Sequence, residues 1–167
     1  MQRRIIGILL TLLCFLAALP GPAVLAAELP PQEVQYDWLV ENDPRERGSS
    51  APGAATVAAL PYAASADIAN EVYTNKCVKP SSTSLKLEFE GSVNGDTQGK
   101  ASVQIWLYNA RTGRHVATRT LSQGRSFNLN TTVTQLNSGD PYYLRIFLTE
   151  KTSTETRVSF TLWLKNA

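Results

Sequence analysis

A chain of 167 residues has room for one domain of ordinary size and a tail, but not for two large domains. Its formal net charge is +2, and we expect no nucleic-acid partner. Its two cysteines exclude a scaffold held together by several disulfides.

Residues 1–26 have the pattern of a secretory signal peptide. Residues 1–4 are basic, residues 5–19 form an apolar run of about fifteen residues, and residues 24–26 end in the small side chains that signal peptidase recognises. A retained membrane anchor is the alternative, but a spanning helix needs roughly 20 apolar residues, and Pro20 breaks this run. We therefore expect an exported protein, secreted or held at the cell surface, that has no membrane span after cleavage.

Cleavage would leave Cys77 as the only cysteine of the mature chain, so an internal disulfide is excluded. A small buried side chain is the common outcome for such a cysteine, and pairing with a second chain is the alternative. The sequence leaves these two states of Cys77 open. A bacterial source fits this sparing use of cysteine.

The mature chain is predicted to divide at residue 75 into an arm and a domain. Residues 28–75 carry eight acidic and two basic side chains, whereas residues 76–167 carry twelve basic and six acidic ones. Residues 48–66 are mostly small, a composition that cannot bury enough apolar area to offset the entropy of ordering the chain. We therefore predict a largely disordered arm and linker over residues 27–75. The arm is either a solubilising tail or a shield that an anionic partner displaces from the basic domain.

Two short stretches of the arm depart from this composition. Residues 34–40 combine Tyr36 and Trp38 with three aliphatic side chains, too apolar a mixture for an inert tail. Such a segment can add a strand to a sheet edge or lay its rings on an apolar patch, in its own domain or in a protein partner. Residues 67–73 fit either a helical turn or a first strand.

Residues 84–165 contain six short segments in which apolar and polar side chains mostly alternate. In the first segment, Leu85, Leu87 and Phe89 would face inward and the charged residues between them outward. The six segments are residues 84–90, 103–108, 116–121, 127–133, 142–149 and 158–165, and the alternation is weakest in the third.

Turn sequences separate these segments at short intervals, which is typical of an antiparallel sandwich. One of them, residues 109–114, predicts a hairpin in which Gly113 takes a left-handed position. The predicted fold is therefore all-β. It is an antiparallel β-sandwich of immunoglobulin-like or Greek-key type, with six to seven strands in residues 76–167.

Tyr142 begins the fifth segment after a turn rich in Gly, Asp and Pro. On the buried face it can bury its ring and send its hydroxyl back to the backbone of the preceding corner, beside the inward-facing Leu136. Residues 136–146 resemble the equivalent stretch of fibronectin type III domains. They are still more similar to bacterial pre-peptidase C-terminal domains, where a Gly-containing turn, a Tyr-Tyr pair and an alternating strand occur near the end of a secreted sandwich. The resemblance implies a non-catalytic accessory or binding role and carries over no site residues.

Side chains that could support catalysis or bind a metal are few. His115 is the only histidine, it follows a hairpin turn, and no serine lies in a Gly-flanked elbow. Glu88 and Glu90 share a strand face roughly 6 to 7 Å apart, as in glycosidases, but alternating charges of this kind ordinarily face solvent. The loop at residues 94–98 offers oxygen ligands but one carboxylate, too few for calcium. We therefore predict a protein that is not an enzyme and has no cofactor and no metal site.

Large aromatic and basic side chains occur on the faces of three segments that should contact water. They are Trp106, Tyr108, Tyr143, Arg145, Phe147, Trp163 and Lys165. They would form one strip if the second, fifth and sixth segments are neighbours in one sheet. Flat rings on a rigid sheet stack on sugars or peptide planes, and basic residues can orient an anionic or hydroxyl-rich ligand.

This strip is the predicted binding site of an exported, non-catalytic module for carbohydrate or other cell-envelope material. That function requires Trp106 and Trp163 to be exposed on one face. In the alternative, the protein is an interaction or structural subunit of a surface assembly, and residues 34–40 or a protein partner cover the rings. Neither function involves nucleic acid.

Overall fold

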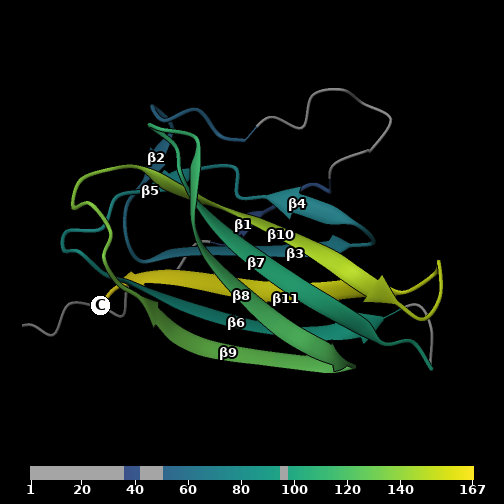
Figure 1. Ribbon diagram of the computed structural model, residues 1–167. Coiled ribbons are helices and arrows are strands. Elements are labelled where there is room, and N and C mark those ends of the chain that lie inside the picture. Colours follow the sequence, from purple (N-terminus) through teal and green to yellow (C-terminus); the bar gives the residue numbers. More distant parts are fainter. Residues whose placement is uncertain (1–35, 42–50, 95–97) are drawn as a thin grey trace, which may run out of the picture. The chain divides into compact units, whose positions relative to one another are not determined.

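The computed structural model describes residues 36–41, 51–94 and 98–167, which form two packed β-sheets (Figure 1). The predicted signal peptide and the first part of the predicted linker, residues 48–50, lie outside the described residues. Within the described residues, no helix is long and apolar enough to cross a membrane.

The described residues contain eleven strands. They are β1 (Tyr36–Trp38), β2 (Val57–Ala58), β3 (Tyr62–Ile68), β4 (Glu71–Tyr73), β5 (Cys77–Val78), β6 (Leu85–Asn94), β7 (Ala101–Asn109), β8 (Arg114–Gly124), β9 (Ser126–Val133), β10 (Tyr142–Lys151) and β11 (Arg157–Asn166). The six segments predicted from alternation are β6 to β11, including the weakest of them, which is the long edge strand β8.

Five strands form sheet A, in the order β1-β3-β11-β6-β9. Six form sheet B, in the order β2-β5-β10-β7-β8, with β4 also paired to β10. Paired strands are antiparallel except β1 with β3 and β2 with β5. The predicted all-β sandwich is confirmed, but it is not purely antiparallel, because each sheet has a short parallel pair at one end.

The prediction of a largely disordered arm and linker over residues 27–75 is wrong for the strands β1 to β4, and most clearly for β3. This strand lies inside sheet A, paired with β1 on one side and β11 on the other. Its alanines are almost fully buried because each faces a large side chain on β11: Ala64 is paired with Leu162 and Ala66 with Phe160. Small residues fill such narrow spaces well, although their composition on its own is typical of a linker.

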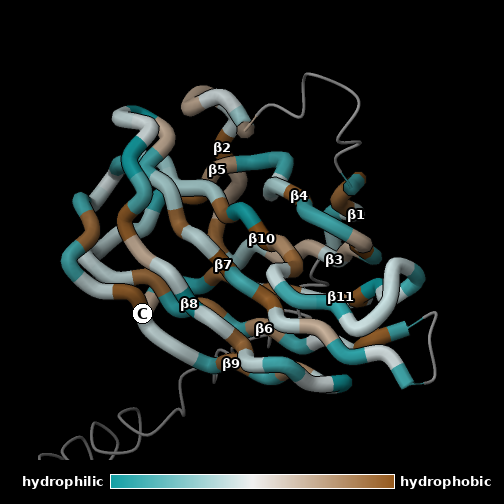
Figure 2. The backbone as a smooth tube through the Cα atoms, turned by 45° about the vertical axis from the view of Figure 1, so that its right-hand side comes forward, coloured by the Kyte–Doolittle hydropathy of each residue, from teal (hydrophilic) through white to brown (hydrophobic). Residues whose placement is uncertain are grey.

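The core lies between the two sheets and is built from the inward residues of alternating strands. Hydrophobic and hydrophilic stretches alternate along several strands (Figure 2). The rings of Phe89 and Phe160 stack with their centroids 4.9 Å apart. A Cβ atom at Gly91 would lie 3.1 Å from both the Phe160 Cβ and the Ser159 carbonyl oxygen, so glycine allows β6 and β11 to approach there.

Tyr142 occupies the corner that the sequence predicted for it. Its side chain is 1% exposed, and its hydroxyl accepts a 2.8 Å hydrogen bond from the backbone N–H of Asn137. Leu136 is buried beside it, and Gly139 takes a positive φ of 79° in the turn between them. Gly113 has a φ of 67°, which confirms the predicted left-handed position in the β7–β8 hairpin.

Cys77 is fully buried on β5 and has no disulfide partner among the described residues. Its Sγ lies 3.7 Å from the carbonyl oxygen of Gly53, and burial raises the pKa of the thiol. In this chain it is therefore a small packed side chain.

Candidate functional site

The outer face of sheet B carries a cluster of aromatic side chains around one arginine. We call it the aromatic face. Its members are Tyr73 on β4, Trp106 and Tyr108 on β7, and Tyr143, Arg145 and Phe147 on β10. Because β10 is hydrogen-bonded to β7 on one side and to β4 on the other, these residues meet as cross-strand neighbours.

The rings of the aromatic face contact one another in defined geometries. Tyr108 and Tyr143 stack almost in parallel, with centroids 5.2 Å apart and planes at 7°. The ring of Trp106 meets Phe147 edge to face at 5.0 Å and 85°. It also lies 4.9 Å from the ring of His115 on β8. Such pairs prefer offset or T-shaped arrangements, so the cluster is ordered by its own contacts.

Arg145 lies at the centre of the aromatic face. Its Cζ atom is 4.6 Å from the ring centre of Phe147 and 5.6 Å from that of Trp106. Its Nε donates a 2.8 Å hydrogen bond to the Glu71 carboxylate, and a terminal guanidinium nitrogen contacts the same oxygen. Burial acts to lower the pKa of Arg145, but the hydrogen bond and charge of Glu71 outweigh it and the pKa is raised. The guanidinium is therefore charged and held in place.

Two phenols of the aromatic face, those of Tyr73 and Tyr143, stay protonated at neutral pH. Burial raises the pKa of both Tyr73 and Tyr143 above the ordinary value. Their hydroxyls can therefore donate as well as accept hydrogen bonds. Together with the Arg145–Glu71 pair, they set polar groups beside flat apolar surfaces.

The prediction of one strip was wrong for Trp163 and Lys165. Both lie on β11, which pairs with β3 and β6 in sheet A. The chain crosses from sheet B to sheet A between β10 and β11, so these two consecutive strands are not neighbours. The other five predicted residues share the aromatic face, but Trp106 and Trp163 do not share a face.

Of the two possibilities left open for residues 34–40, the structure shows the first for residues 36–38, because β1 pairs with β3 at the edge of sheet A. The hypothesis that this segment covers the strip is wrong for the aromatic face of sheet B. The ring of Tyr36 instead meets Trp163 edge to face at 6.1 Å and 74°. Tyr36 of the predicted arm thus contacts Trp163, the one predicted ring that lies in sheet A and not in sheet B.

Three members of this region escaped the sequence prediction: Glu71, Tyr73 and His115. Residues 71–73 alternate around the buried Val72, which is a strand signal, but three residues are too few to distinguish a strand from a helical turn. His115 was considered as a catalytic group, not as a neighbour of Trp106. Its Nε2 lies 2.9 Å from the Ala117 carbonyl oxygen and from the Thr118 hydroxyl oxygen.

The carboxylates on the outer face of sheet A have an electrostatic environment unlike a glycosidase pair. Glu88 lies 2.8 Å from the ammonium group of Lys86 and contacts that of Lys165. These two lysines lower the pKa of Glu88, with Lys165 the larger contributor. Glu90 is exposed beside it. Among the described residues, no group of three or more His, Cys, Asp or Glu side chains is arranged to hold a metal ion.

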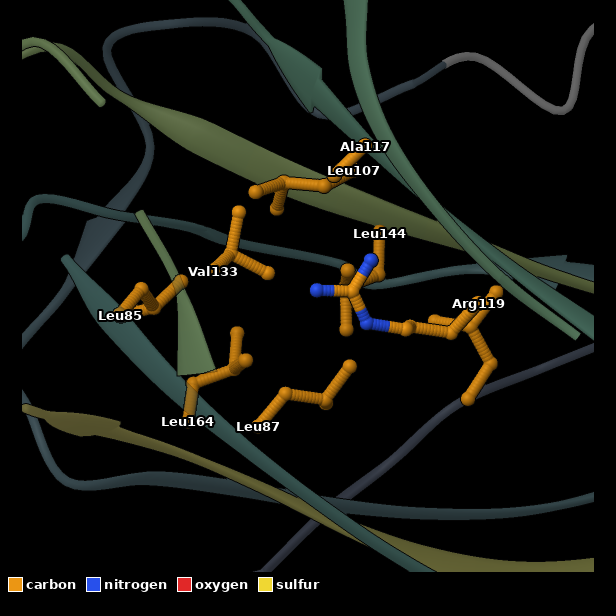
Figure 3. Close-up of a pocket in the computed structure, with 9 residues that line it drawn as sticks. Leu85, Leu87, Leu107, Ala117, Arg119, Val133, Leu144 and Leu164 are labelled. Atoms are coloured by element: carbon orange, nitrogen blue, oxygen red, sulfur yellow. The ribbon is translucent and has the colours of Figure 1, made fainter. Parts of the chain in front are cut away.

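A small cavity lies between the two sheets and is lined mainly by leucines (Figure 3). The guanidinium of Arg119 points into it, with Nε 3.4 Å from the Thr131 hydroxyl oxygen. The cavity has a volume of about 10 Å³, roughly that of one water molecule. It is too small for an organic ligand, so the sheet surfaces are the better candidates for binding.

No family model matches this chain, and a search of the curated proteins found no match. The resemblance to pre-peptidase C-terminal and fibronectin type III domains therefore stays a prediction.

Proposed function

We propose that this protein is an exported, non-catalytic binding module that holds a carbohydrate chain on the aromatic face of sheet B. The observation that supports this function is the ordered cluster of outward rings around the Arg145–Glu71 pair. Trp106, Tyr108 and Phe147 are all half-buried rather than covered, so each presents part of its ring to solvent.

The chemistry of this face suits a sugar. The C–H groups of a pyranose ring form an apolar face that packs on an aromatic ring, and the sugar hydroxyls need donors and acceptors at its rim. Arg145 and Glu71 are 28% and 30% exposed, and they supply donors and an acceptor at the centre of the cluster.

The charge of the site favours a neutral ligand over an anionic one. The Arg145 guanidinium is already paired with the Glu71 carboxylate, so an anion would have to displace Glu71 or bind beside it. A hydroxyl-rich chain can instead bind both partners without separating them. The open face also suits a chain better than a small molecule, which needs an enclosing pocket.

The chain contains three tryptophans, and only Trp106 lies in sheet B, which makes a direct test available. In the variant Trp38→Phe/Trp163→Phe, Trp106 is the sole reporter. Titration with cellohexaose, chitohexaose and soluble peptidoglycan fragments should give a saturable change in its emission with at least one of these probes. Arg145→Ala in the same background should weaken that response about tenfold, since it removes the central donor.

Two outcomes would contradict the proposal. If acrylamide quenches Trp106 freely but none of the three probes changes its emission, the face is open and does not bind carbohydrate. If acrylamide cannot reach Trp106 in the native protein, the face is covered. The alternative function, a structural subunit of a surface assembly, is then favoured.

A further inference from the structure

Residues 36–40, which comprise β1 and the two residues after it, display three apolar side chains to solvent. Tyr36 is 51% exposed, Trp38 is 66% exposed and Val40 is 78% exposed, whereas Leu39 between the last two is 2% exposed. Successive residues of a strand point to opposite faces, so burying Leu39 forces its neighbours outward. Large rings that stand in water on a folded surface commonly serve to bind something.

The strand that carries these rings is held firmly. The Leu39 N–H donates a 2.8 Å hydrogen bond to the Ser65 carbonyl oxygen. The Glu41 carboxylate accepts a 2.8 Å hydrogen bond from the Ala69 N–H and pairs with Arg157 at 3.3 Å. Trp38 is therefore presented on a fixed strand rather than on a loose tail, which lowers the entropic cost of binding through it.

A row of polar side chains runs from Trp38 across the outer face of sheet A. In register, one residue from each of the five strands contributes to it: Trp38, Ser65, Thr161, Glu90 and Asn128. Neighbouring strands are about 4.8 Å apart, so the row is roughly 19 Å long. Ser65 and Thr161 share a hydrogen bond of 3.1 Å, and Glu90 and Asn128 are exposed. We call these five residues the polar row.

A second ring reinforces the aromatic end of the polar row. Trp163 and Tyr36 are both paired with Ala63, on its two sides. Because the Ala63 side chain is small, the two rings meet above it at 6.1 Å. Trp163 is half-buried and lies next to Thr161 on the same face of β11, so a ligand on Trp38 would also reach it.

The far end of the polar row has an open hollow. Its volume is about 370 Å³, and Glu90 and Asn128 are among the residues that line it, with Gly91, Ser126 and Phe127. The polar row thus starts at exposed rings and ends at a hollow with exposed amide and carboxylate groups.

We propose that the outer face of sheet A is a second binding site, which takes a neutral oligosaccharide lying across the strands along the polar row. One sugar stacks on Trp38, and the hydroxyls of the following sugars bind Ser65, Thr161, Glu90 and Asn128. Within the polar row the charged group is Glu90, which has no ion-pair partner among the described residues and would repel an anion bound beside it, so the row favours a neutral chain. The site uses no residue of the aromatic face, so it stands or fails independently of the function proposed above.

The variant Trp106→Phe tests this second site, because its remaining tryptophans, Trp38 and Trp163, both lie in sheet A. We expect cellohexaose, chitohexaose or mannohexaose to change their emission saturably. In the Trp106→Phe background, Trp38→Ala and Asn128→Ala, at opposite ends of the polar row, should each weaken binding at least about fivefold, as read from the emission of the remaining sheet A tryptophans. Val40→Ala is the matched control, since it removes an exposed apolar group of the same segment outside the polar row, and it should leave the affinity unchanged.

The proposal is overturned if none of the three hexaoses changes the emission of Trp106→Phe. It is also overturned if Val40→Ala weakens binding as much as Trp38→Ala while Asn128→Ala has no effect. Binding would then depend on the exposed apolar side chains of residues 36–40 and not on the polar row, and light scattering of the full chain would show whether a second copy of the chain covers them.

Discussion

Aromatic rings lie on the outer faces of both sheets, but the contacts of the rings differ between the two faces. On sheet B the rings pack against one another and around Arg145, with the Tyr108 and Tyr143 rings 5.2 Å apart. On sheet A, Trp38 is 66% exposed at the edge strand, and polar side chains fill the rest of the row. Rings on sheet B should therefore stabilise the fold as well as bind, whereas Trp38 on sheet A should serve binding with little effect on stability.

The cause of this difference is strand pairing. The two long strands β7 and β10 are direct neighbours, so outward rings on them become cross-strand pairs. On sheet A the rings sit on β1 and β11, which are separated by β3 and its small outward residues. Trp106 on sheet B is thus half-buried among other rings, whereas Trp38 on sheet A, which is paired with Ser65, is 66% exposed.

The largest expected effect is the difference in stability between a variant that lacks Trp106 of sheet B and one that lacks Trp38 of sheet A. Trp106→Ala should lower the free energy of unfolding by about 2 kcal/mol, because it removes the contacts of the Trp106 ring with Phe147, His115 and Arg145. Trp38→Ala should lower it by less than about 0.5 kcal/mol. Urea unfolding of the two variants and of the unchanged chain measures both. Equal losses would mean that the two faces do not differ in the way described.

The second prediction compares the cation of each face. Arg145→Met keeps an apolar stem between the rings but leaves Glu71 without its partner, so it should cost about 1 kcal/mol. Lys165→Met is the matched control, and it should cost no more than about 0.3 kcal/mol because Glu88 keeps Lys86 at 2.8 Å. Urea unfolding at low and high salt provides the measurement. If Lys165→Met lowered the free energy of unfolding more than Arg145→Met does, the ion pair that stabilises the fold would be the one on sheet A.

The sequence predicted the strands well where one face is buried and the other wet. Alternation marked β6 to β11, and the turn before Tyr142 marked the corner that its hydroxyl closes onto Asn137. Each of these signals is local, because it depends on residues a few positions apart.

Such local signals predict neither the order of the strands in a sheet nor the alanine-rich strand β3. Alternation states which side chains share a face of one strand, but not which strands are neighbours, so Trp163 was grouped with Trp106. In β3 the alternating residues are nearly all small, and the contrast between inward Ala64 and outward Ser65 is slight. What makes β3 a strand is the large side chains of β11 opposite it, which no local pattern reveals.

The third prediction separates the faces at high pH. Burial raises the pKa of Tyr73 and Tyr143 on the aromatic face. Their contribution to stability is complete below the pKa of an unfolded tyrosine, about 10, and is lost as the pH rises through the higher pKa of the folded protein. Tyr62, whose pKa burial also raises, contributes in the same range.

Tyr73→Phe/Tyr143→Phe should therefore lose less stability between pH 9 and 11 than the unchanged chain, as measured by urea midpoints. Tyr36→Phe is the matched control, because it removes a tyrosine hydroxyl of sheet A, outside the aromatic face. The same slope in all three proteins would assign the alkaline loss to buried groups outside the aromatic face, such as Tyr62 and Cys77.

The smallest expected effect is the acid response of sheet A. Hydrogen bonds from Lys165 and then Lys86 lower the pKa of Glu88. Because the folded pKa is depressed, this contribution is present above the pKa of an unfolded glutamate, about 4.3, and is lost as the pH falls through the lower folded value. Asp140, whose pKa the Asn109 amide lowers, loses its contribution in the same range.

Glu88→Gln should consequently flatten part of the fall in stability below about pH 4.3 and change little at pH 7, where exposed ion pairs contribute modestly. Since the pairs of Glu88 are partly exposed, 0.5 M NaCl should shrink the difference between Glu88→Gln and the unchanged chain by screening. Asp140→Asn is the comparison, because a hydrogen bond from a neutral amide is its leading interaction and salt screens that bond little. If salt changed both differences equally, the acid response of Glu88 would not come from its lysines. The acid response of the outer face of sheet A would then depend on ion pairs no more than the acid response of the turn that holds Asp140.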